Sequence, residues 1–525
     1  MTREKLFYNI YLLGFVSLAV AVPTSNYVMS LSQIIMAGAW LFYGHYRQGW
    51  KQLLSEKIGW ILISFFILHV IGLIYTSDFN YAIKDLRTKL PLLVLPFIIF
   101  SMPRPSKRFL EFVVWMHALA ILVASIIGIF LAQQKGYINY RLYSPGISHI
   151  RFGLNICLSG VLLTYYFFHL KNLFLRICAA ALVLWYIVYL FLFGSVTAFI
   201  ILCILFIIGI SVFIIRHTSL WGKISYAVLL TALIVGFVLV IRETLEPFLQ
   251  HSNKKIDITQ LEKYSADGHP YLHDTIYFGK EFGQYVGLYY CPDELPEAWA
   301  KRSKLDYYGK DLAGQPLMAT IVRYLNSKGL RKDARGLAQL SDEEIRWIEK
   351  GVANAQYMQS SALKRTIMET ALGYEHFKEG NGTRGNSIMQ RFELWRVSLK
   401  IIEKNPIIGV GTGDVPLAFK QQLAAIQSDL SATSLRSHNQ YLSITIAFGI
   451  IGLLWFLWVL FYPLKIKNLY KDGPYMAFLI IIMVSMINED TLESQAGITF
   501  YVFFSLFLYL LSTTKETVKN SISNR

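Results

Sequence analysis

Long apolar runs decide what this 525-residue chain can fold into. A helix needs about 20 apolar residues to cross the hydrocarbon core of a bilayer. We predict about twelve spanning helices, near residues 6–22, 25–44, 59–76, 88–101, 109–132, 149–169, 174–193, 195–214, 223–242, 440–462, 475–488 and 496–512. Only 16% of the residues are charged, against about 25% in ordinary globular domains. The chain is therefore predicted to be an all-α polytopic membrane protein.

One long polar interval divides the chain. Nine predicted spans occupy residues 1–242, a large and mostly helical loop domain occupies 243–437, and three spans with a tail occupy 438–525. When the predicted spans alternate across the membrane, every short loop on the side of the N-terminus is basic. Basic loops of membrane proteins stay in the cytoplasm. This rule predicts that both termini are cytoplasmic and that the large loop lies outside. It also accounts for the net charge of +16 without a nucleic-acid partner.

Some basic residues fall on the predicted outer side, against that pattern. These residues are Lys84, Arg87 and Lys89 in "YAIKDLRTKL", Arg141 and Arg151 in "YRLYSPGISHIRFG", and Arg436 in "SLRSHNQ". Outer loops carry some basic residues, and long cationic side chains near helix ends reach the interface. Their convergence on one side favours a second interpretation, in which they bind an anionic substrate from outside.

Metal chemistry has little support in the sequence. His269 and His273 are four residues apart beside Asp274, but no third ligand follows at a recognisable spacing. The four cysteines have no metal-ligand spacing either. We expect neither a metal nor a cofactor. In the same region, Ser341 followed by Glu344 predicts a capping box at a helix start.

The segment "SIMQRFELWRVSLKIIEKNP" predicts a helix that starts at Ser387 and ends before Pro406. Arg391 lies in its first turns, outside the polar face. A cation at that place opposes the helix dipole, whereas a helix start favours anions. Arg391 therefore either contacts an acidic neighbour or binds an anion. The glycines of the following "NPIIGVGTGD" predict a tight turn, since no strand precedes them as in nucleotide-binding motifs.

These segments resemble the core of the O-antigen ligase and O-antigen polymerase superfamily. The resemblance rests on Arg391, Leu394 and Trp395, then Pro406, Gly409 and Gly411, then His438, Asn439 and Gly449. The outer segment from "RYLNSKGLRKDARGL" to "IEKGVANAQY" resembles the Bacteroidetes-type ligases.

The resemblance implies a metal-independent, GT-C-like glycosyltransferase of the bacterial inner membrane. Such an enzyme takes a glycan from undecaprenyl diphosphate at the periplasmic face during lipopolysaccharide biosynthesis. A ligase passes it to the lipid A–core oligosaccharide, and a Wzy-like polymerase passes it to another lipid-linked repeat unit. His438 would then activate or position the acceptor, and Arg391 would stabilise the diphosphate.

The sequence departs from the family at one position, because Val196 stands where many members carry an arginine. Arg151 and Arg141 are the expected substitutes. Glu489 and Glu493 either orient these arginines or belong to a solvated acidic loop. A transporter is an alternative of another class, but transporters tend to show internal repeats, and we see none in this sequence.

Overall fold

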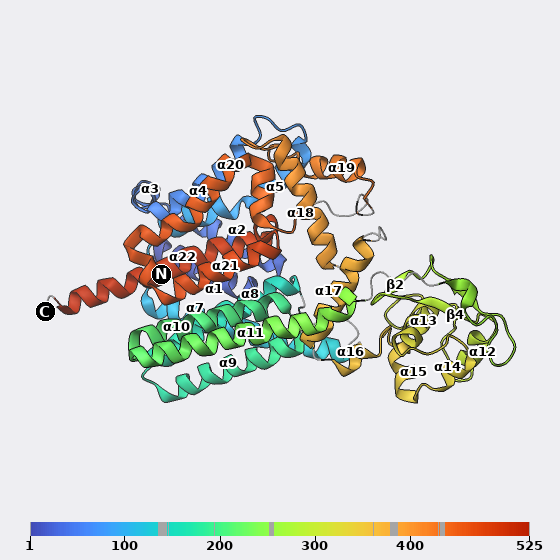
Figure 1. The fold of residues 1–525 in the computed structure, drawn as a ribbon. Helices are drawn as coiled ribbons and strands as arrows, with labels where there is room; N and C mark the ends of the chain where they lie inside the picture. Colours follow the sequence, from blue (N-terminus) through green and yellow to red (C-terminus); the bar gives the residue numbers. More distant parts are fainter. Residues whose placement is uncertain are drawn as a thin grey trace. The chain divides into compact units, whose positions relative to one another are not determined.

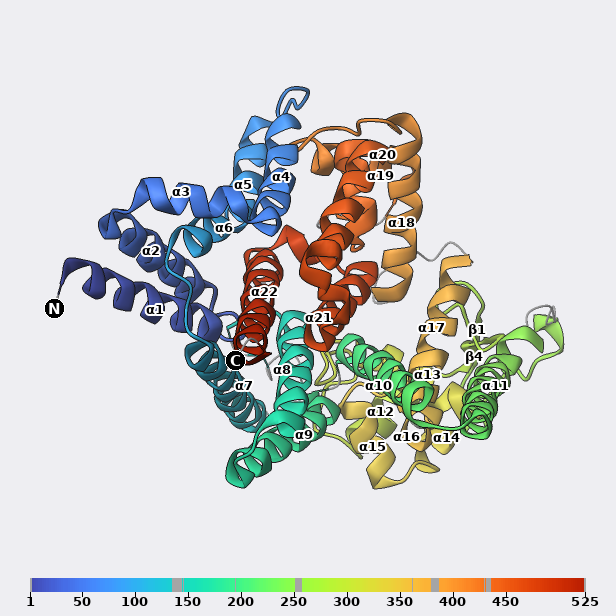
Figure 2. The ribbon, with the colours of Figure 1, turned by 90° about the vertical axis from the view of Figure 1, so that its left-hand side faces the viewer.

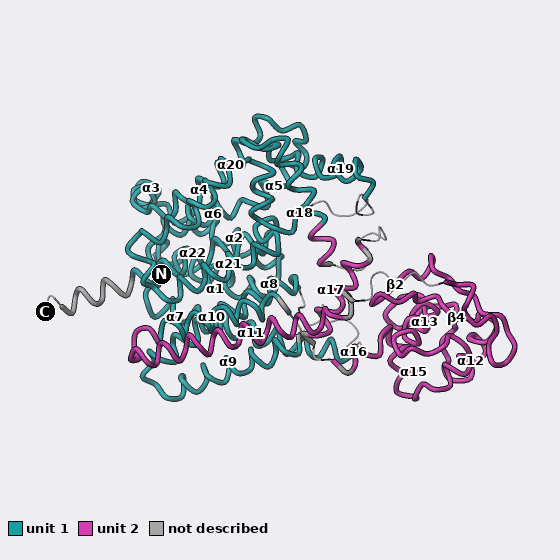
Figure 3. The backbone as a smooth tube through the Cα atoms, in the orientation of Figure 1, with its two compact units in different colours: residues 1–213, 393–525 teal, residues 214–392 magenta. Residues whose placement is uncertain are grey.

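The computed structural model describes residues 2–134, 144, 146–193, 195–250, 257–360, 362–378, 387–428, 430 and 436–523. Two compact units divide the chain (Figure 3). Unit 1 contains residues 1–213 and 393–525, and unit 2 contains residues 214–392. Each unit is described by itself.

Unit 1 is helical throughout its described part (Figure 1). Its helices are α1 (Arg3–Ala21), α2 (Asn26–Tyr43), α3 (Tyr46–Ser55), α4 (Lys57–Ile71), α5 (Phe79–Lys89), α6 (Pro91–Ser101), α7 (Lys107–Gln134), α8 (His149–His169), α9 (Leu173–Phe193), most of α10 (Val196–His217) and of α18 (Ser387–Lys404), α19 (Val415–Ala425), α20 (Gln440–Phe461), α21 (Gly473–Asn488) and α22 (Gln495–Ser523). Figure 2 shows α22 between α1 and α21, and its apolar part is almost completely buried. Phe503 of α22, for example, packs against Phe15 of α1.

Eight helices of the described chain are long and apolar enough to cross a membrane, and the bent pair of α2 and α3 would make a ninth span. These helices confirm the prediction of an all-α polytopic membrane protein. Helices α4 and α21 have 15 and 16 residues, which is about 23 Å of helix. The run near 88–101 is not one helix, because α6 begins at Pro91 after α5 has ended. The number of twelve spans stays a prediction.

Helix α20 is broken at Gly449, whose φ is +62°. The glycine-rich turn after α18 pairs with the backbone at this break. Val410 N donates to Ile446 O, and Gly411 N donates to Ala447 O. In the other direction, Ile450 N donates to Pro406 O. A Cβ atom on Gly449 would lie 2.2 Å from Ile407. Irregular backbone is tolerated at membrane depth only where protein surrounds it, and this turn supplies that surrounding.

In unit 2, α11 (Leu220–Gln250) packs against α17 (Ala362–Lys378). Residues 257–360 contain α12 (Leu295–Ala300), α13 (Leu317–Ser327), α14 (Ala334–Ala338), α15 (Asp342–Glu349), α16 (Gln356–Gln359), and two antiparallel pairs, β1 (Leu272–Asp274) with β4 (Gly287–Tyr290) and β2 (Lys280–Glu281) with β3 (Gln284–Tyr285). Trp299 and Tyr324 lie in a common apolar core. The predicted capping box is confirmed, because Ser341 and Glu344 cap α15 reciprocally.

Candidate functional site

Asp490 organises the turn that leads into α20. It lies just after α21 and is buried. Its carboxylate accepts four hydrogen bonds: from Ser437 Oγ at 3.1 Å, His438 N at 2.9 Å, Asn439 N at 3.1 Å and Ser443 Oγ at 2.7 Å. Burial raises the pKa of the Asp490 carboxyl. One acidic side chain therefore fixes the backbone on both sides of the histidine.

His438 is held in an uncommon backbone conformation, with φ at +51°. The left-handed region costs a non-glycine residue about 1 kcal/mol or more, so the surrounding contacts must stabilise it. Asn439 supplies part of that support, because its side chain caps α20 at Leu442 N and donates to Ile487 O. The His438 side chain stays 37% exposed. It can therefore meet a substrate at the start of α20.

The turn after α21 also holds Arg151 of α8. Arg151 Nη2 donates to the backbone oxygen of Asp490 at 3.1 Å, and Nη1 lies 3.5 Å from Glu489 Oε2. The same Glu489 oxygen lies 4.0 Å from His438 Nδ1. The structure thus brings together His438 and Arg151, two of the predicted site residues, through an acidic pair.

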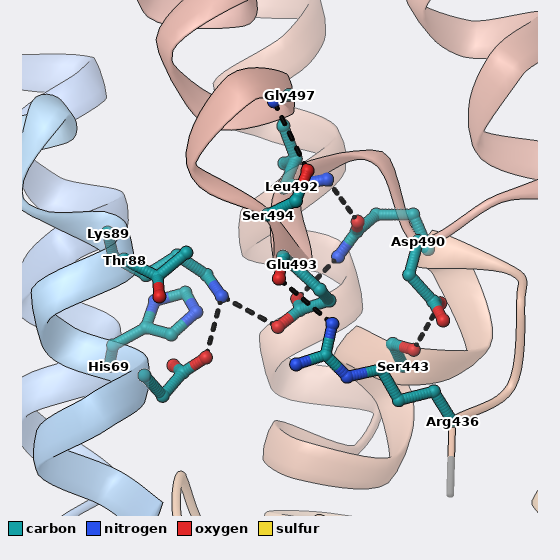
Figure 4. A network of polar contacts seen from close by, with 12 residues as sticks. His69, Thr88, Lys89, Arg436, Ser443, Asp490, Leu492, Glu493, Ser494 and Gly497 are labelled. Carbon is teal, nitrogen blue, oxygen red and sulfur yellow. Dashed lines mark hydrogen bonds and ion pairs between the residues drawn. The ribbon is translucent and has the colours of Figure 1, made fainter. Parts of the chain in front are cut away.

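Lys89 forms the centre of a second cluster, next to this turn (Figure 4). Its side chain is completely buried, and Nζ donates to Asp85 Oδ1 at 2.8 Å and to Glu493 Oε2 at 2.7 Å. Burial alone would lower the pKa of the Lys89 ammonium, but the two carboxylates outweigh it and raise the pKa. Burial raises the pKa of Asp85 to about 6.

Glu493 links this cluster to Arg436. Its second carboxylate oxygen accepts from Gln440 Nε2 at 2.9 Å, and its backbone oxygen accepts from Arg436 Nη1 at 2.9 Å. Arg436 Nη2 donates to Tyr81 OH at 3.3 Å. Burial would raise the pKa of Glu493, but the charges of Lys89 and Arg436 hold it below its usual range. The two cations thus balance two carboxylates.

A small cavity lies beside this cluster. Its lining includes His69, Tyr81, Asp85, Arg436 and Glu493, and its volume is about 30 Å³. That volume holds one or two water molecules. A sugar diphosphate does not fit in it.

The other predicted residues are placed differently. Arg87 is exposed on α5, whereas Asp85 and Lys89 of the same helix are buried. Arg391 is half-buried in the first turns of α18 and belongs to unit 2, whereas His438 belongs to unit 1. Arg141 lies outside the described residues. In residues 257–360, His269 faces Glu294 at 3.1 Å, whereas His273 bonds to the backbone of Glu262 and Tyr289, so the two imidazoles have different partners.

Sequence reasoning missed Asp85 and Asp490, and it offered the outer arginines as partners of Glu489 only as one of two alternatives. A signal existed for Asp85, because it precedes Lys89 by four residues on a helix, which is the spacing of a side-chain ion pair. No comparable local signal existed for Asp490, since its partners lie about fifty residues earlier in the chain.

One segment of the chain matches a known family. Residues 351–457 match the family model described as O-antigen ligase. The match covers α18, the glycine-rich turn, His438 and the break in α20, and it confirms the resemblance predicted from the sequence. Among curated proteins, no sequence matches the chain.

Proposed function

We propose that this O-antigen-ligase-like chain transfers a glycan from undecaprenyl diphosphate to the lipid A–core oligosaccharide. The reaction would take place at the periplasmic face of the bacterial inner membrane, with both chain termini in the cytoplasm. The observation that carries the proposal is the His438 turn: it lies inside the segment that matches the family, and a buried carboxylate holds it at the start of a membrane helix.

The leaving group of this reaction is a diphosphate. Cations that are fixed where its negative charge builds up stabilise the transition state. Arg151 suits this role, because its Nε has no hydrogen-bond partner among the described residues. Arg87, Arg141 and Arg391 were predicted from the sequence to bind the anionic substrate, and for each of them this role stays a proposal.

The position of Arg151 supports the proposal that it replaces the arginine that many family members carry in place of Val196. Thr197, the next residue, accepts a hydrogen bond from Asn488 Nδ2 at 3.1 Å. The start of α10 therefore lies next to the turn after α21. Asp490 in that turn accepts a hydrogen bond from Arg151. An arginine from α8 can thus reach the place where other family members use one from the start of α10.

His438 is proposed to take the proton of the acceptor hydroxyl. The acceptor oxygen forms its bond to the anomeric carbon of the glycan, the bond from that carbon to the phosphate oxygen breaks, and the diphosphate leaves with the electron pair. A neutral imidazole accepts a proton readily near neutral pH, and such a positioned base contributes about 10²–10⁴-fold to the rate.

Arg436, Lys89 and Glu493 serve the same site in this proposal. Lys89 has no exposed surface, so it acts through Glu493, whose carboxylate it holds in place. Glu493 in turn holds Arg436 at the approach to His438. This arrangement keeps one guanidinium near the acceptor end of the site.

The test is transfer by the purified full-length protein from a polyprenyl-diphosphate glycan to lipid A–core, without added metal or ATP. We expect His438→Ala and Arg391→Ala to lower the rate by about 100-fold or more. His169→Ala, at the opposite end of α8, is the matched control and should transfer normally. Wild-type rates in both site variants would show that the proposed site is wrong.

A gene deletion separates the ligase from the polymerase within this family. Loss of a ligase leaves long lipid-linked polymer that is never attached to the core. Loss of a polymerase leaves cores that carry single repeat units. We expect the first outcome, because the outer segment before residue 357 resembles the ligases; the second would make the protein a polymerase.

A further inference from the structure

One oxygen of Glu489 faces two groups of the site. Glu489 Oε2 lies 3.5 Å from Arg151 Nη1 and 4.0 Å from His438 Nδ1. Charge-assisted hydrogen bonds between nitrogen and oxygen are usually about 2.7–2.9 Å long. Both contacts are longer than that, and the contact with His438 is the longer of the two.

Two contacts hold the backbone of His438 in place. Its backbone is fixed by Asp490 through His438 N and by the cap of α20 at Asn439. His438 Nδ1 is buried and has no hydrogen-bond partner among the described residues. A shift of the Glu489 side chain by about 1 Å would give Nδ1 the partner that it lacks.

We propose that Glu489 is a positioning residue for His438, and that donor binding at Arg151 engages it. This inference rests on the proposed function. The diphosphate of the donor bonds to Arg151 and weakens the contact between Arg151 and Glu489. The carboxylate then closes on Nδ1–H of His438, which leaves the lone pair of Nε2 to take the proton of the acceptor hydroxyl.

The closed contact has two consequences. It selects the ring tautomer that carries hydrogen on Nδ1, and it stabilises the imidazolium that forms when Nε2 takes the proton. The base is therefore activated only after the donor has bound. Among the described residues, Asp490 also acts on His438 electrostatically, and Arg151, Arg436 and Glu493 lie around Asp490. A change at Glu489 removes its contact with Arg151, whereas the four hydrogen bonds that Asp490 accepts do not involve Glu489.

The first experiment follows the pH dependence of kcat for transfer by full-length Glu489→Gln. Without the carboxylate, the imidazolium is less stable and the ring stays neutral to lower pH. We expect kcat to fall about tenfold or more and the acidic limb of its profile to move to lower pH. The control is Glu111→Gln, a half-exposed carboxylate on α7 that pairs with Lys107. Its kcat and the acidic limb of its pH profile should equal those of the wild type.

The second experiment reads the ring without relying on transfer. Nitrogen-15 spectra of the histidine-labelled protein, with His438→Gln to assign the signal, should show the tautomer with hydrogen on Nδ1. Adding undecaprenyl diphosphate should strengthen that hydrogen bond in the wild type but not in Glu489→Leu. Melting temperatures of the variants check that each is folded.

The outcomes separate the inference from the proposed function. A wild-type protein that does not transfer glycan refutes the proposed function. If the wild type transfers normally and Glu489→Gln lowers kcat without moving the acidic limb of its pH profile, the positioning role of Glu489 is refuted but the proposed function is not. A His438 signal that does not respond to undecaprenyl diphosphate refutes the link to donor binding.

Discussion

Asp490→Asn tests whether one buried carboxylate holds the turn that carries His438. In the wild type, Oδ1 accepts from Ser437 Oγ, Asn439 N and Ser443 Oγ, and Oδ2 accepts from His438 N. An asparagine can keep its oxygen at the Oδ1 place. Its amide NH2 group then faces His438 N–H, so two donors oppose each other.

The magnitude follows from that geometry. One buried backbone N–H loses its partner, which costs about 1–3 kcal/mol, and three remaining bonds weaken because their acceptor is no longer charged. We expect a total loss of about 2–4 kcal/mol in the free energy of unfolding. Native domains are stable by about 5–15 kcal/mol, so the variant should still fold.

The effect on transfer should be larger than the effect on stability. His438 has φ at +51° only because its neighbours hold it there, and a displacement of about 1 Å at a reacting group can cost about 100-fold in rate. The assay measures thermal unfolding in detergent and the rate of glycan transfer on the same preparations.

Asp472→Asn is the matched control for this prediction. Asp472 caps α21 by accepting from Tyr475 N, and asparagine caps helices about as well as aspartate. The control should therefore change stability by less than about 0.5 kcal/mol. If Asp490→Asn unfolds and transfers like this control, Asp490 does not hold the turn.

Three further substitutions probe the interior of unit 1. Lys89→Met should lower the free energy of unfolding by about 3–5 kcal/mol, because its two buried carboxylates lose their cation; chemical denaturation would show this, and the exposed Lys84→Met should have no such effect. The pKa of Asp85 is about 6 in the folded protein, against 3.8 for the unfolded chain. The Asp85 carboxyl therefore contributes its full stabilisation below pH 3.8, and this stabilisation is lost as the pH rises through 6. Asp85→Asn should flatten the resulting fall in melting temperature between these two pH values. Gly449→Ala should cost at least about 2 kcal/mol, since φ is positive there and Ile407 is in contact, whereas Gly160→Ala, with open space around it, should keep the wild-type melting temperature.

Several features were predictable from the sequence because they depend on residues that are near one another in the chain. Hydropathy located the apolar helices, and the capping box of Ser341 and Glu344 follows from a spacing of three residues. The motif around His438 carried the resemblance that the family match confirms. The run near 88–101 was the exception, because Pro91 divides it between two helices.

The contacts of the candidate site were not predictable in this way. Lys89 and Glu493 are 404 residues apart, and His438 and Asp490 are 52 apart. Sequence alone placed Lys89 among the outer cations that meet a substrate. The structure buries it between two carboxylates, because α5 and the turn before α22 pack together.

By itself, the sequence determined that this chain enters a membrane and that a histidine lies at the start of a membrane helix. Apolar length and local spacing are enough for both conclusions, since each is a property of one segment. Only the tertiary structure decided which carboxylates face that histidine and which cations are already neutralised. Those pairings arise when helices from distant parts of the chain pack and exclude water, so that each buried charge must find its partner.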